Sequence, residues 1–537
     1  MDIDRVYSGE SVRHAIRRLY GEHSDVPVKL PHATVPPITT ALVREHAEVF
    51  DTILRTVREQ VDREQQSAEE ASFNTTATGH WLLSVPPSLW QHEAEVVNYL
   101  GMLVAIDFCH WAEVHPISRG DREEESATME EGGIVSAPGE AVTGFAGFYT
   151  VVEEEEESPS AASTLQSAGS RATEVLTEPK DKAEGPPGGG GGGVVPAAKD
   201  VTLLRGSAAM MFLLRRAVAV HRVPWYDIDY LQQFHGDVAA ALREMKVCFL
   251  GCQKDGATPL WMPCTRARVR LLLSLAEAFA EQHTSFYQLL RECAGYMFRP
   301  PANTAAARAG VRGFVPSLVR FHPRYHDFAH ECGSDASSVS SSSSSGPAHG
   351  NGAAGVPILK LSQLTALALE QSLPELWRCR CRSAPSSFAT SPATALSLSW
   401  MAERAVEVVK SHGVGLFTDR AELSICCDYQ IPKALRAAGL LLYDAHLAQM
   451  VDHHVLLRPG AAEEASIRIA TLVAADRLLE FLNAQRSHTS SSQKSPSTSE
   501  TTCMSCSVNH LDYTLWYIGR YMVPSEARHH LCRTIMY

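Results

Sequence analysis

The 537-residue sequence contains no apolar run of the roughly 18 residues needed to cross a membrane. Residues 1–21, MDIDRVYSGESVRHAIRRLYG, also lack the apolar core of a secretory signal. Basic residues are not in excess, because 48 Lys and Arg stand against 61 Asp and Glu, for a formal charge of −13. We therefore expect a soluble protein of the cytoplasm, or of the nucleus, that binds neither membranes nor nucleic acid directly.

Motifs for metals, phosphate loops and serine nucleophiles are also missing or incomplete. The glycine run 188–193 is not followed by the Lys and Ser/Thr of a phosphate loop, and no Ser-centred nucleophile elbow occurs. Cys503 and Cys506 have zinc-knuckle spacing but no second pair, and the histidine pairs 453–454 and 529–530 lack metalloprotease spacing. We expect no metal and no cofactor, and the 13 scattered cysteines are typical of reduced thiols.

Three low-complexity segments are too polar, or too rich in Gly, Ser and Pro, to join a core. They cover 121–200, 333–355 and 487–505, and we predict that they are disordered insertions. The remaining segments are expected to form one domain. These segments are 1–120, 201–332, 356–486 and 506–537.

Hydrophobic periodicity in the rest of the chain is helical. Apolar residues recur at intervals of three and four in 206–221, 268–293 and 463–485, and 92–113 is a long apolar run more easily buried as a helix than as a strand. No succession of strands and crossover helices is visible, which argues against a doubly wound sheet. The pattern predicts an all-α fold.

The stretch CCDYQIPKALRAAGLLLYD (426–444) places a carboxylate, Asp428, just before an amphipathic segment. With the preceding LSI it predicts two short helices around a turn, Pro432 lying in the first turn of the second helix. On spacing alone Asp428 is a helix cap, whose carboxylate accepts backbone N–H groups. A catalytic role is the alternative.

Two further carboxylates, Asp107 and Asp512, lie among aromatic residues. Burial raises the pKa of a lone carboxylate, so each needs a partner or a function. Each is either a hydrogen-bonded structural acid or part of a polar ligand pocket. The walls of such a pocket would be Phe108, Trp111, Tyr513 and Trp516.

Taken in order, several segments resemble the queuosine 5′-phosphate N-glycosylase/hydrolase family, the queuosine salvage proteins. VVNYLGMLVAIDFCHWAE is similar to the family's V-N-W helix with its N-F-x-F-W ending, and GSAAMMFLLRRAVAVHRVP to its Gly-Tyr-Trp helix. CCDYQIPKALRAAGLLLYD is similar to F-A-D-Y-R-V-P-Q-x-L-x-x-L-G. The segments MPCTRARVRLL, PRYHDF, LDYTLW and HHLCRTIMY complete the resemblance, which covers about residues 80–537 outside the insertions.

The resemblance implies hydrolysis of the N-glycosidic bond of queuosine 5′-monophosphate, a small nucleotide, to queuine and ribose 5-phosphate. It also implies a helical fold similar to helix-hairpin-helix DNA glycosylases. Asp428 matches the Asp of the D-Y-R-V-P motif and becomes the candidate nucleophile or stabiliser of an oxocarbenium ion.

Substrate contacts are assigned on the same basis. Asp512 would accept hydrogen bonds from the base, and His80 is a further candidate base contact. Lys360 and Arg533 would bind the phosphate, although both could instead form surface salt bridges. The remaining pocket residues are the stacking candidates Tyr429, Phe108, Trp111 and Trp516, with Tyr513, Asp107 and Cys426 beside them.

The sequence departs from the family pattern at Cys426, where Phe is usual, and at Asp107, where Asn is usual. These departures leave open a related deazaguanine nucleotide or nucleoside as the substrate. A glycosylase that acts on nucleic acid is a second alternative, for which the chain lacks a basic stripe. A helical scaffold with structural buried acids is the third.

Overall fold

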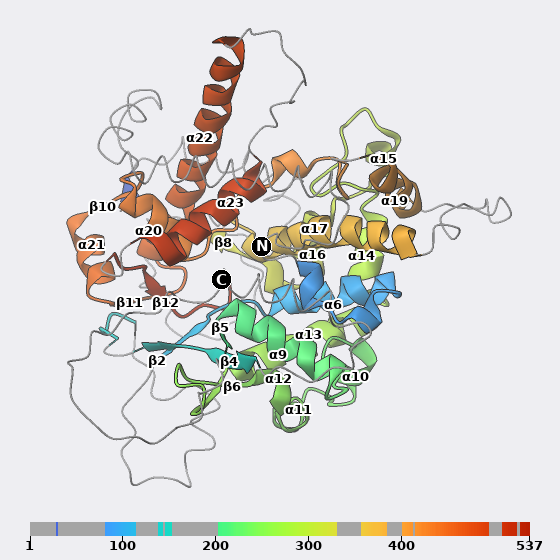
Figure 1. Ribbon diagram of the computed structural model, residues 1–537, viewed down its shortest axis with the longest axis horizontal. Coiled ribbons are helices and arrows are strands. Elements are labelled where there is room, and N and C mark those ends of the chain that lie inside the picture. Colours follow the sequence, from blue (N-terminus) through green and yellow to red (C-terminus); the bar gives the residue numbers. More distant parts are fainter. Residues whose placement is uncertain are drawn as a thin grey trace, which may run out of the picture.

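The computed structural model describes ten segments of the chain. They are residues 28–29, 81–113, 138–142, 145–152, 202–329, 356–383, 400–411, 414–492, 507–523 and 527–537. His80 and the Cys503 and Cys506 pair lie outside these described residues. Helices form most of the secondary structure, and short strands lie among them (Figure 1).

The helices of residues 81–325 precede those of the carboxy-terminal part. The first group is α5 (Trp81–Ser84), η1 (Pro87–Leu89), α6 (Glu93–Ala105), α9 (Ser207–Ala219), α10 (Ile228–Gln232), α11 (Val238–Glu244), α12 (Lys246–Phe249), α13 (Thr265–Glu281), α14 (Phe286–Glu292), α15 (Ala305–Arg308), α16 (Phe314–Phe321) and η2 (Pro323–Tyr325). The second group is α17 (Lys360–Ser383), α19 (Trp400–Lys410), η5 (Arg420–Glu422), α20 (Gln430–Ala437), α21 (Ala445–Asp452), α22 (Ala462–Ser492), α23 (Val508–Tyr517) and the π-helical turn η6 (Ile518–Met522).

The strands have two to four residues each. They are β1 (Val28–Lys29), β2 (Trp111–Glu113), β3 (Phe145–Gly147), β4 (Tyr149–Val152), β5 (Thr202–Arg205), β6 (Leu250–Cys252), β7 (Pro259–Trp261), β8 (Phe328–Ala329), β9 (Val356–Pro357), β10 (Leu442–Tyr443), β11 (Leu456–Leu457) and β12 (Leu531–Cys532). The largest sheet has the order β5-β4-β6-β7 and is antiparallel. The others are two-stranded.

The all-α prediction is therefore correct only for the larger part of the described chain. Strands this short contain too few residues to display an alternating pattern, so sequence periodicity does not reveal them. The predicted helix over 92–113 ends at Ala105, and its last residues form β2, which pairs with β3. The helices predicted at 206–221 and 463–485 are confirmed as α9 and α22.

Local capping explains where several helices begin. Asp227 accepts the N–H of Tyr230 at the start of α10, and Asp444 accepts the N–H of Leu447 at the start of α21. Ser285 caps α14 in the same way. It divides the apolar segment 268–293 into α13 and α14, where the periodicity predicted continuous helix.

The structure describes parts of two of the three predicted insertions. Residues 145–152 lie inside the segment 121–200, yet they form β3 and β4, and β4 pairs with both β5 and β6. Helix α22 continues to Ser492, inside the predicted insertion 487–505. The segment 333–355 lies outside the described residues. Because the composition of 121–200 as a whole is polar, the sequence did not predict the strands at 145–152.

One hydrophobic core extends from Trp81 to Tyr537 through the described segments. Helix α17 contacts α5, α6, α16 and α19, and α14 packs on α6 (Figure 1). Gly101 makes this last contact possible, because a Cβ there would lie 2.4 Å from the ring of Phe286. No helix in the described part of the chain is both long and apolar enough to span a membrane.

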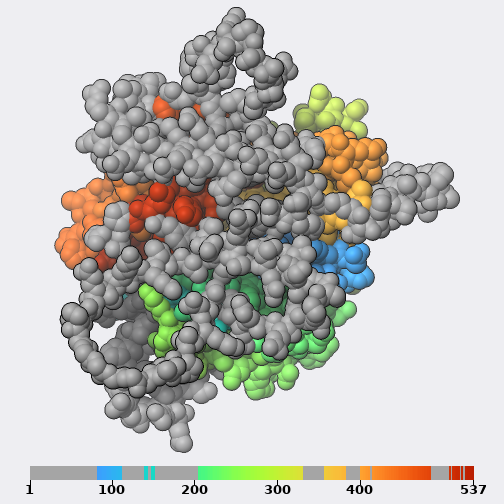
Figure 2. All heavy atoms as spheres, in the orientation of Figure 1, coloured from blue at the N-terminus to red at the C-terminus, as the bar shows by residue number. Residues whose placement is uncertain are grey.

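The carboxy-terminal elements return to the loop that follows α6. Strand β12 lies parallel to β11, and the N–H of Cys109 donates to the carbonyl of Tyr537 at 3.1 Å. Helices α20 and α23 also pack on each other. On the face in Figure 2, carboxy-terminal residues in red lie between the orange elements and the green residues that follow 202. Residues far apart in the sequence therefore meet at the carboxy-terminal elements.

Candidate active site

Asp428 caps helix α20, as one of the two interpretations predicted. Its Oδ1 accepts the N–H groups of Gln430 at 2.8 Å and Ile431 at 3.1 Å. Residues 423–427, which precede it, have no helical structure, so the prediction of two helices around a turn is wrong in its first half. Among the described residues, none hydrogen-bonds to Oδ2 of Asp428. One oxygen is thus used for capping, and the other remains available for chemistry.

Burial raises the pKa of Asp428 above its ordinary value. The charge of Lys360 and the two backbone hydrogen bonds oppose this rise, and the Asp107 carboxylate adds to it. Asp428 is therefore in electrostatic contact with a second acid and with a cation. Such a setting is typical of a functional carboxylate, although structural ion networks can also produce it.

Asp512 lies on α23 and binds the segment that precedes Asp428. Its Oδ1 accepts the N–H of Cys426 at 2.6 Å. Burial raises the pKa of Asp512 to about 7, and the Asp428 carboxylate contributes to that rise, whereas the Cys426 N–H and Lys360 oppose it. Asp512 thus interacts electrostatically with Asp428 and is hydrogen-bonded to the segment that precedes it.

Lys360 is the cation that these acids share. It is 6% exposed, and it opposes the rise of the pKa values of Asp428 and Asp512 and helps lower that of Asp107. Its side chain makes no hydrogen bond or ion pair with any residue that the structure describes. The predicted alternative of a surface salt bridge therefore does not apply to the described surroundings of Lys360.

The backbone of Lys360 is held in place by the buried ion pair of Asp327 and Arg468. Its N–H donates to Oδ2 of Asp327 at 3.0 Å, and Asp327 accepts two hydrogen bonds of 2.7 Å from Arg468 of α22. Leu359 precedes it in the left-handed region with φ 50°. The bidentate pair thus sets the position where α17 begins, and with it the position of the amine.

Asp107 belongs to a compact polar cluster at the end of α6. Its Oδ1 accepts the hydroxyl of Ser207 at 2.6 Å and lies 2.7 Å from Nε2 of His110. Ser207 Oγ is also 2.9 Å from the same nitrogen. Burial opposes ionisation of Asp107, but the hydrogen bond and charge of His110, with Lys360 and Ser207, hold its pKa well below the usual range. Asp107 is therefore a charged carboxylate, and burial lowers the pKa of His110.

Two arginines hold the loop that carries Asp107. Arg268 of α13 donates to the carbonyls of Ile106, Phe108 and Cys109, and Arg324 donates to the carbonyl of Ala105 at 2.7 Å. Their guanidinium carbons lie 4.4 and 5.0 Å from the centre of the Phe108 ring. This arrangement fully buries Phe108. It does not support the stacking role predicted for that ring.

The remaining aromatic candidates lie around the same elements. Tyr429 is half-buried, with its ring centre 4.9 Å from that of His529. Trp111 in β2 is buried beneath Arg533, whose guanidinium carbon is 5.9 Å from the ring centre. On α23, Tyr513 packs against Trp516 at 5.9 Å between ring centres.

Sequence reasoning missed His110, Ser207 and Arg268. His110 lies three residues after Asp107, a spacing that a search for short polar clusters could have found. Arg268 lies within the Met-Pro segment already used for the resemblance. No local signal identifies Ser207 as a partner of Asp107, because 100 residues separate them.

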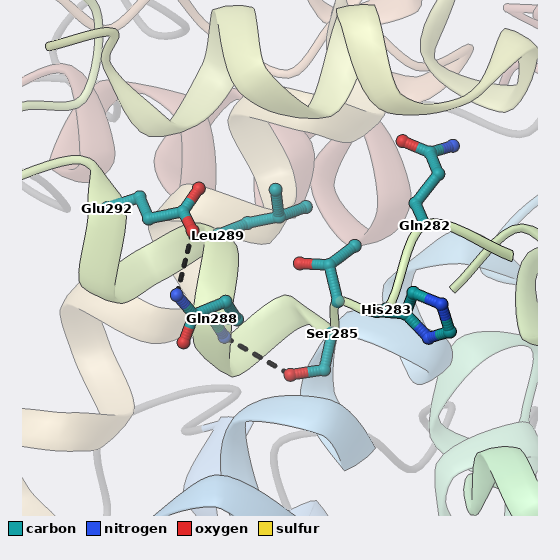
Figure 3. A pocket seen from close by; sticks show the side chains of 7 residues that line it. Gln282, His283, Ser285, Gln288, Leu289 and Glu292 are labelled. Carbon is teal, nitrogen blue, oxygen red and sulfur yellow. Dashed lines mark hydrogen bonds between the residues drawn. The ribbon is translucent and has the colours of Figure 1, made fainter. Parts of the chain in front are cut away.

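A polar hollow elsewhere is not part of this cluster. Its lining comes from the turn between α13 and α14 and from α14 itself, where Gln288 donates to Glu292 at 2.7 Å (Figure 3). None of the candidate residues lines it. Within the described residues, no group of three or more His, Cys, Asp or Glu side chains is arranged to hold a metal ion.

Comparison with known proteins relates part of this chain to one protein family. The queuosine salvage protein family matches residues 403–537, which include Asp428 and Asp512. A queuosine 5′-phosphate N-glycosylase/hydrolase of Dictyostelium discoideum is 24% identical over 128 residues, covering 24% of this chain and 35% of the relative. The protein of the same name from Sphaerobacter thermophilus is 27% identical over 124 residues, covering 23% and 33%.

These matches span about a third of the length of each curated relative. The family match begins at residue 403, so the motifs upstream of it rest on the resemblance alone. The matched region contains the capped carboxylate, its acidic neighbour and Arg533. The resemblance of this chain to the queuosine salvage protein family is therefore confirmed over its carboxy-terminal part.

Proposed function

We propose that the protein hydrolyses the N-glycosidic bond of queuosine 5′-monophosphate and releases queuine and ribose 5-phosphate. The observation that carries this proposal is that the charge of Lys360 acts on the pKa of all three acids, Asp428, Asp107 and Asp512. Asp107 is held in its ionised form, so the group carries a fixed negative charge beside Asp428. Arg268 and Arg324 also act on Asp107. Negative charge fixed in a buried site favours a transition state in which the sugar becomes positive.

The leaving base explains why the sugar side must supply the catalysis. Queuine is a 7-deazaguanine, so carbon replaces the ring nitrogen at which purine leaving groups are often protonated. In the proposed reaction, Oδ2 of Asp428 faces the anomeric carbon and either stabilises the oxocarbenium ion or attacks it. The backbone bonds to Oδ1 hold the carboxylate while Oδ2 acts.

The other residues have binding roles in this proposal. Asp512 accepts hydrogen bonds from the N–H donors of the base, with Tyr429, Trp111 and Trp516 as its stacking surfaces. Lys360 and Arg533 bind the 5′-phosphate, which the negative acids would otherwise repel. His80 is proposed as an additional base contact on the resemblance alone.

We also propose that the helical body is one domain resembling helix-hairpin-helix DNA glycosylases. Its support is the hydrophobic core that connects residues from α5 to the carboxy terminus, together with the predominance of helix. The described strands form one four-stranded sheet and four two-stranded sheets beside these helices.

Chromatography of queuosine 5′-monophosphate incubated with purified protein tests the proposed reaction. We expect queuine and ribose 5-phosphate to appear in equal amounts, because hydrolysis yields one of each. The nucleoside queuosine, tested in parallel, shows whether the phosphate is required. A folded protein that leaves the nucleotide intact would contradict the proposed substrate.

The proposed contact of Asp512 with the base predicts a pH-dependent KM. Because its pKa is raised to about 7, Asp512 is only partly ionised near neutral pH. Binding to N–H donors requires the carboxylate, so we expect KM to fall by up to about tenfold between about pH 6 and about pH 8. Steady-state kinetics across this range measures the change.

Asp512→Asn provides the control, because the amide does not titrate. Its KM should be high and lack the fall attributed to Asp512. In the wild type, the folded-state pKa of about 7 lies above the unfolded value of about 3.9, so stability falls as pH rises from about 4 to about 7. The variant should lose that part of the fall. If the KM of Asp512→Asn depends on pH in the same way as the KM of the wild type, the assigned contact is ruled out.

A further inference from the structure

Two polar side chains of α17 hold the chain that leads to Asp428. Gln363 and Glu370 are about two helical turns apart, so they lie on the same side of α17. Oε1 of Gln363 accepts the N–H of Ser424 at 2.9 Å. Oε2 of Glu370 accepts the N–H of Phe417 at 2.9 Å. The connection from Phe417 to Ser424 is therefore fixed to α17 at both ends.

Gln363 also bonds to the turn that precedes its own helix. Its Nε2 donates to the carbonyl of Ile358 at 3.0 Å. The side chain is fully buried, and its partners define the orientation of the amide. The N–H of Ser424 requires an acceptor, whereas the carbonyl of Ile358 requires a donor. Both polar ends of Gln363 are thus used to join two backbone segments.

The turn before Lys360 is held from two directions. The carbonyl of Asp327 accepts the N–H groups of Ile358 and Leu359 at 2.9 and 3.0 Å, and its carboxylate accepts the N–H of Lys360 at 3.0 Å. Gln363 holds the carbonyl of Ile358 from the next turn of α17. Loss of the Gln363 amide would therefore free one side of the turn from which the amine of Lys360 extends.

The other partner of Gln363 belongs to the segment that carries the candidate catalytic carboxylate. After Ser424 this segment is held again at Cys426, whose N–H donates to Asp512 at 2.6 Å. Asp428 then caps α20. The segment has little freedom between these points, because each is fixed by a direct hydrogen bond. Gln363 therefore connects the start of α17 to the position of Asp428.

We propose that Gln363 is a positioning residue that fixes the amine of Lys360 relative to the carboxylate of Asp428. The inference rests on the proposed function, in which the amine binds the 5′-phosphate and the carboxylate faces the anomeric carbon. The covalent bonds of the ribose 5-phosphate unit limit the distance between these two substrate groups. The protein must hold its two side chains at a matching separation, because a misplacement of about 1 Å can cost about 10²-fold in rate.

A double-mutant cycle with Lys360 tests this role. Gln363→Met keeps the length of the side chain but removes both hydrogen bonds, and we expect it to lower kcat/KM for queuosine 5′-monophosphate by at least about tenfold. In Lys360→Met, the same substitution should lower kcat/KM by less than about threefold, because no amine is left to misplace. Equal losses in the two backgrounds would show that Gln363 acts on the fold alone and would overturn the proposal.

Glu370→Met is the matched control. It removes a buried acceptor of a backbone N–H from the same side of α17, but Glu370 bonds to Phe417 and Arg420 rather than to the turn before Lys360. Glu370→Met should therefore change kcat/KM by the same factor with and without the Lys360 amine. Non-additivity as large as that of Gln363→Met would contradict a specific role for Gln363.

A second variant covers the case in which Gln363→Met does not fold, as judged by circular dichroism. Gln363→Asn keeps an amide but is one methylene shorter, so it cannot reach both backbone partners. We expect the same non-additivity with Lys360→Met. If this variant too gives equal losses in the two backgrounds, the positioning role fails.

Hydrogen–deuterium exchange of the full chain provides a readout that does not depend on activity. In Gln363→Met or Gln363→Asn, the amides of 356–363 and of 423–428 should both exchange faster than in the wild type. In Glu370→Met, the increase should be confined to the region of Phe417. Unchanged exchange in either of the first two segments would overturn the connecting role of Gln363. A folded wild type that leaves the nucleotide intact would instead contradict the proposed function.

Discussion

Asp428→Asn is expected to reduce kcat for hydrolysis of queuosine 5′-monophosphate by about 10²–10³-fold, the usual effect of removing one electrostatic stabiliser. The substitution removes the negative charge while keeping the shape of the side chain. Asparagine is also as good a helix cap as aspartate, so Oδ1 can still accept the N–H groups of Gln430 and Ile431. Turnover measured at saturating substrate gives the effect on the chemical step.

This substitution should not reduce stability. Burial raises the folded-state pKa of Asp428 above its unfolded value, so its stability contribution is lost as pH rises through the folded pKa. Above its folded-state pKa the ionised carboxylate therefore destabilises the fold, and the neutral amide removes that effect. We expect the free energy of unfolding to remain the same or to increase. A loss of activity would then not be a folding defect.

Asp444→Asn is the matched control. Asp444 caps α21 by accepting the N–H of Leu447 at 2.7 Å, and it is not among the groups that shift the pKa of Asp428. Its substitution should leave kcat unchanged. If Asp428→Asn behaves in the same way, Asp428 is only a cap, and the catalytic assignment fails.

Sequence reasoning found the part of the site that local pattern encodes. Asp428 stands directly before an amphipathic segment, and both its cap geometry and α20 follow from that order. Helices α9 and α22 were predictable for the same reason, because their apolar periodicity is long enough to detect. Local spacing also gave a clear reason to examine Asp107 and Asp512.

The contacts between distant segments were not predictable from periodicity. Ser207 meets Asp107 across 100 residues of sequence, and Arg268 reaches Ile106 across 162. The strands at 145–152 lie inside a segment of polar composition, and their pairing partners lie beyond it. Only the folded chain shows that His110 contacts the Asp107 carboxylate. It also shows that the Phe108 ring is covered by Arg268.

Lys360→Met is expected to lower kcat/KM for the nucleotide by about 10–10²-fold, the worth of a hydrogen bond to a charged group. Methionine preserves an unbranched apolar stem but cannot bind phosphate. If Lys360 contacts the 5′-phosphate, the loss should appear mainly in KM. The same substitution should have little effect on KM for the nucleoside queuosine, which lacks that group. Comparing the two substrates isolates the phosphate contact.

The pH profile separates this role from general charge compensation. Lys360 opposes the rise in the pKa of Asp428, so its removal should raise that pKa further and move the acid limb of kcat/KM to higher pH. Lys433→Met is the control, because Lys433 is half-buried on α20 and its charged neighbours are Arg520 and Arg528. That variant should not move the acid limb. A shifted limb with equal KM changes for nucleotide and nucleoside would make Lys360 an electrostatic positioning residue rather than the phosphate ligand.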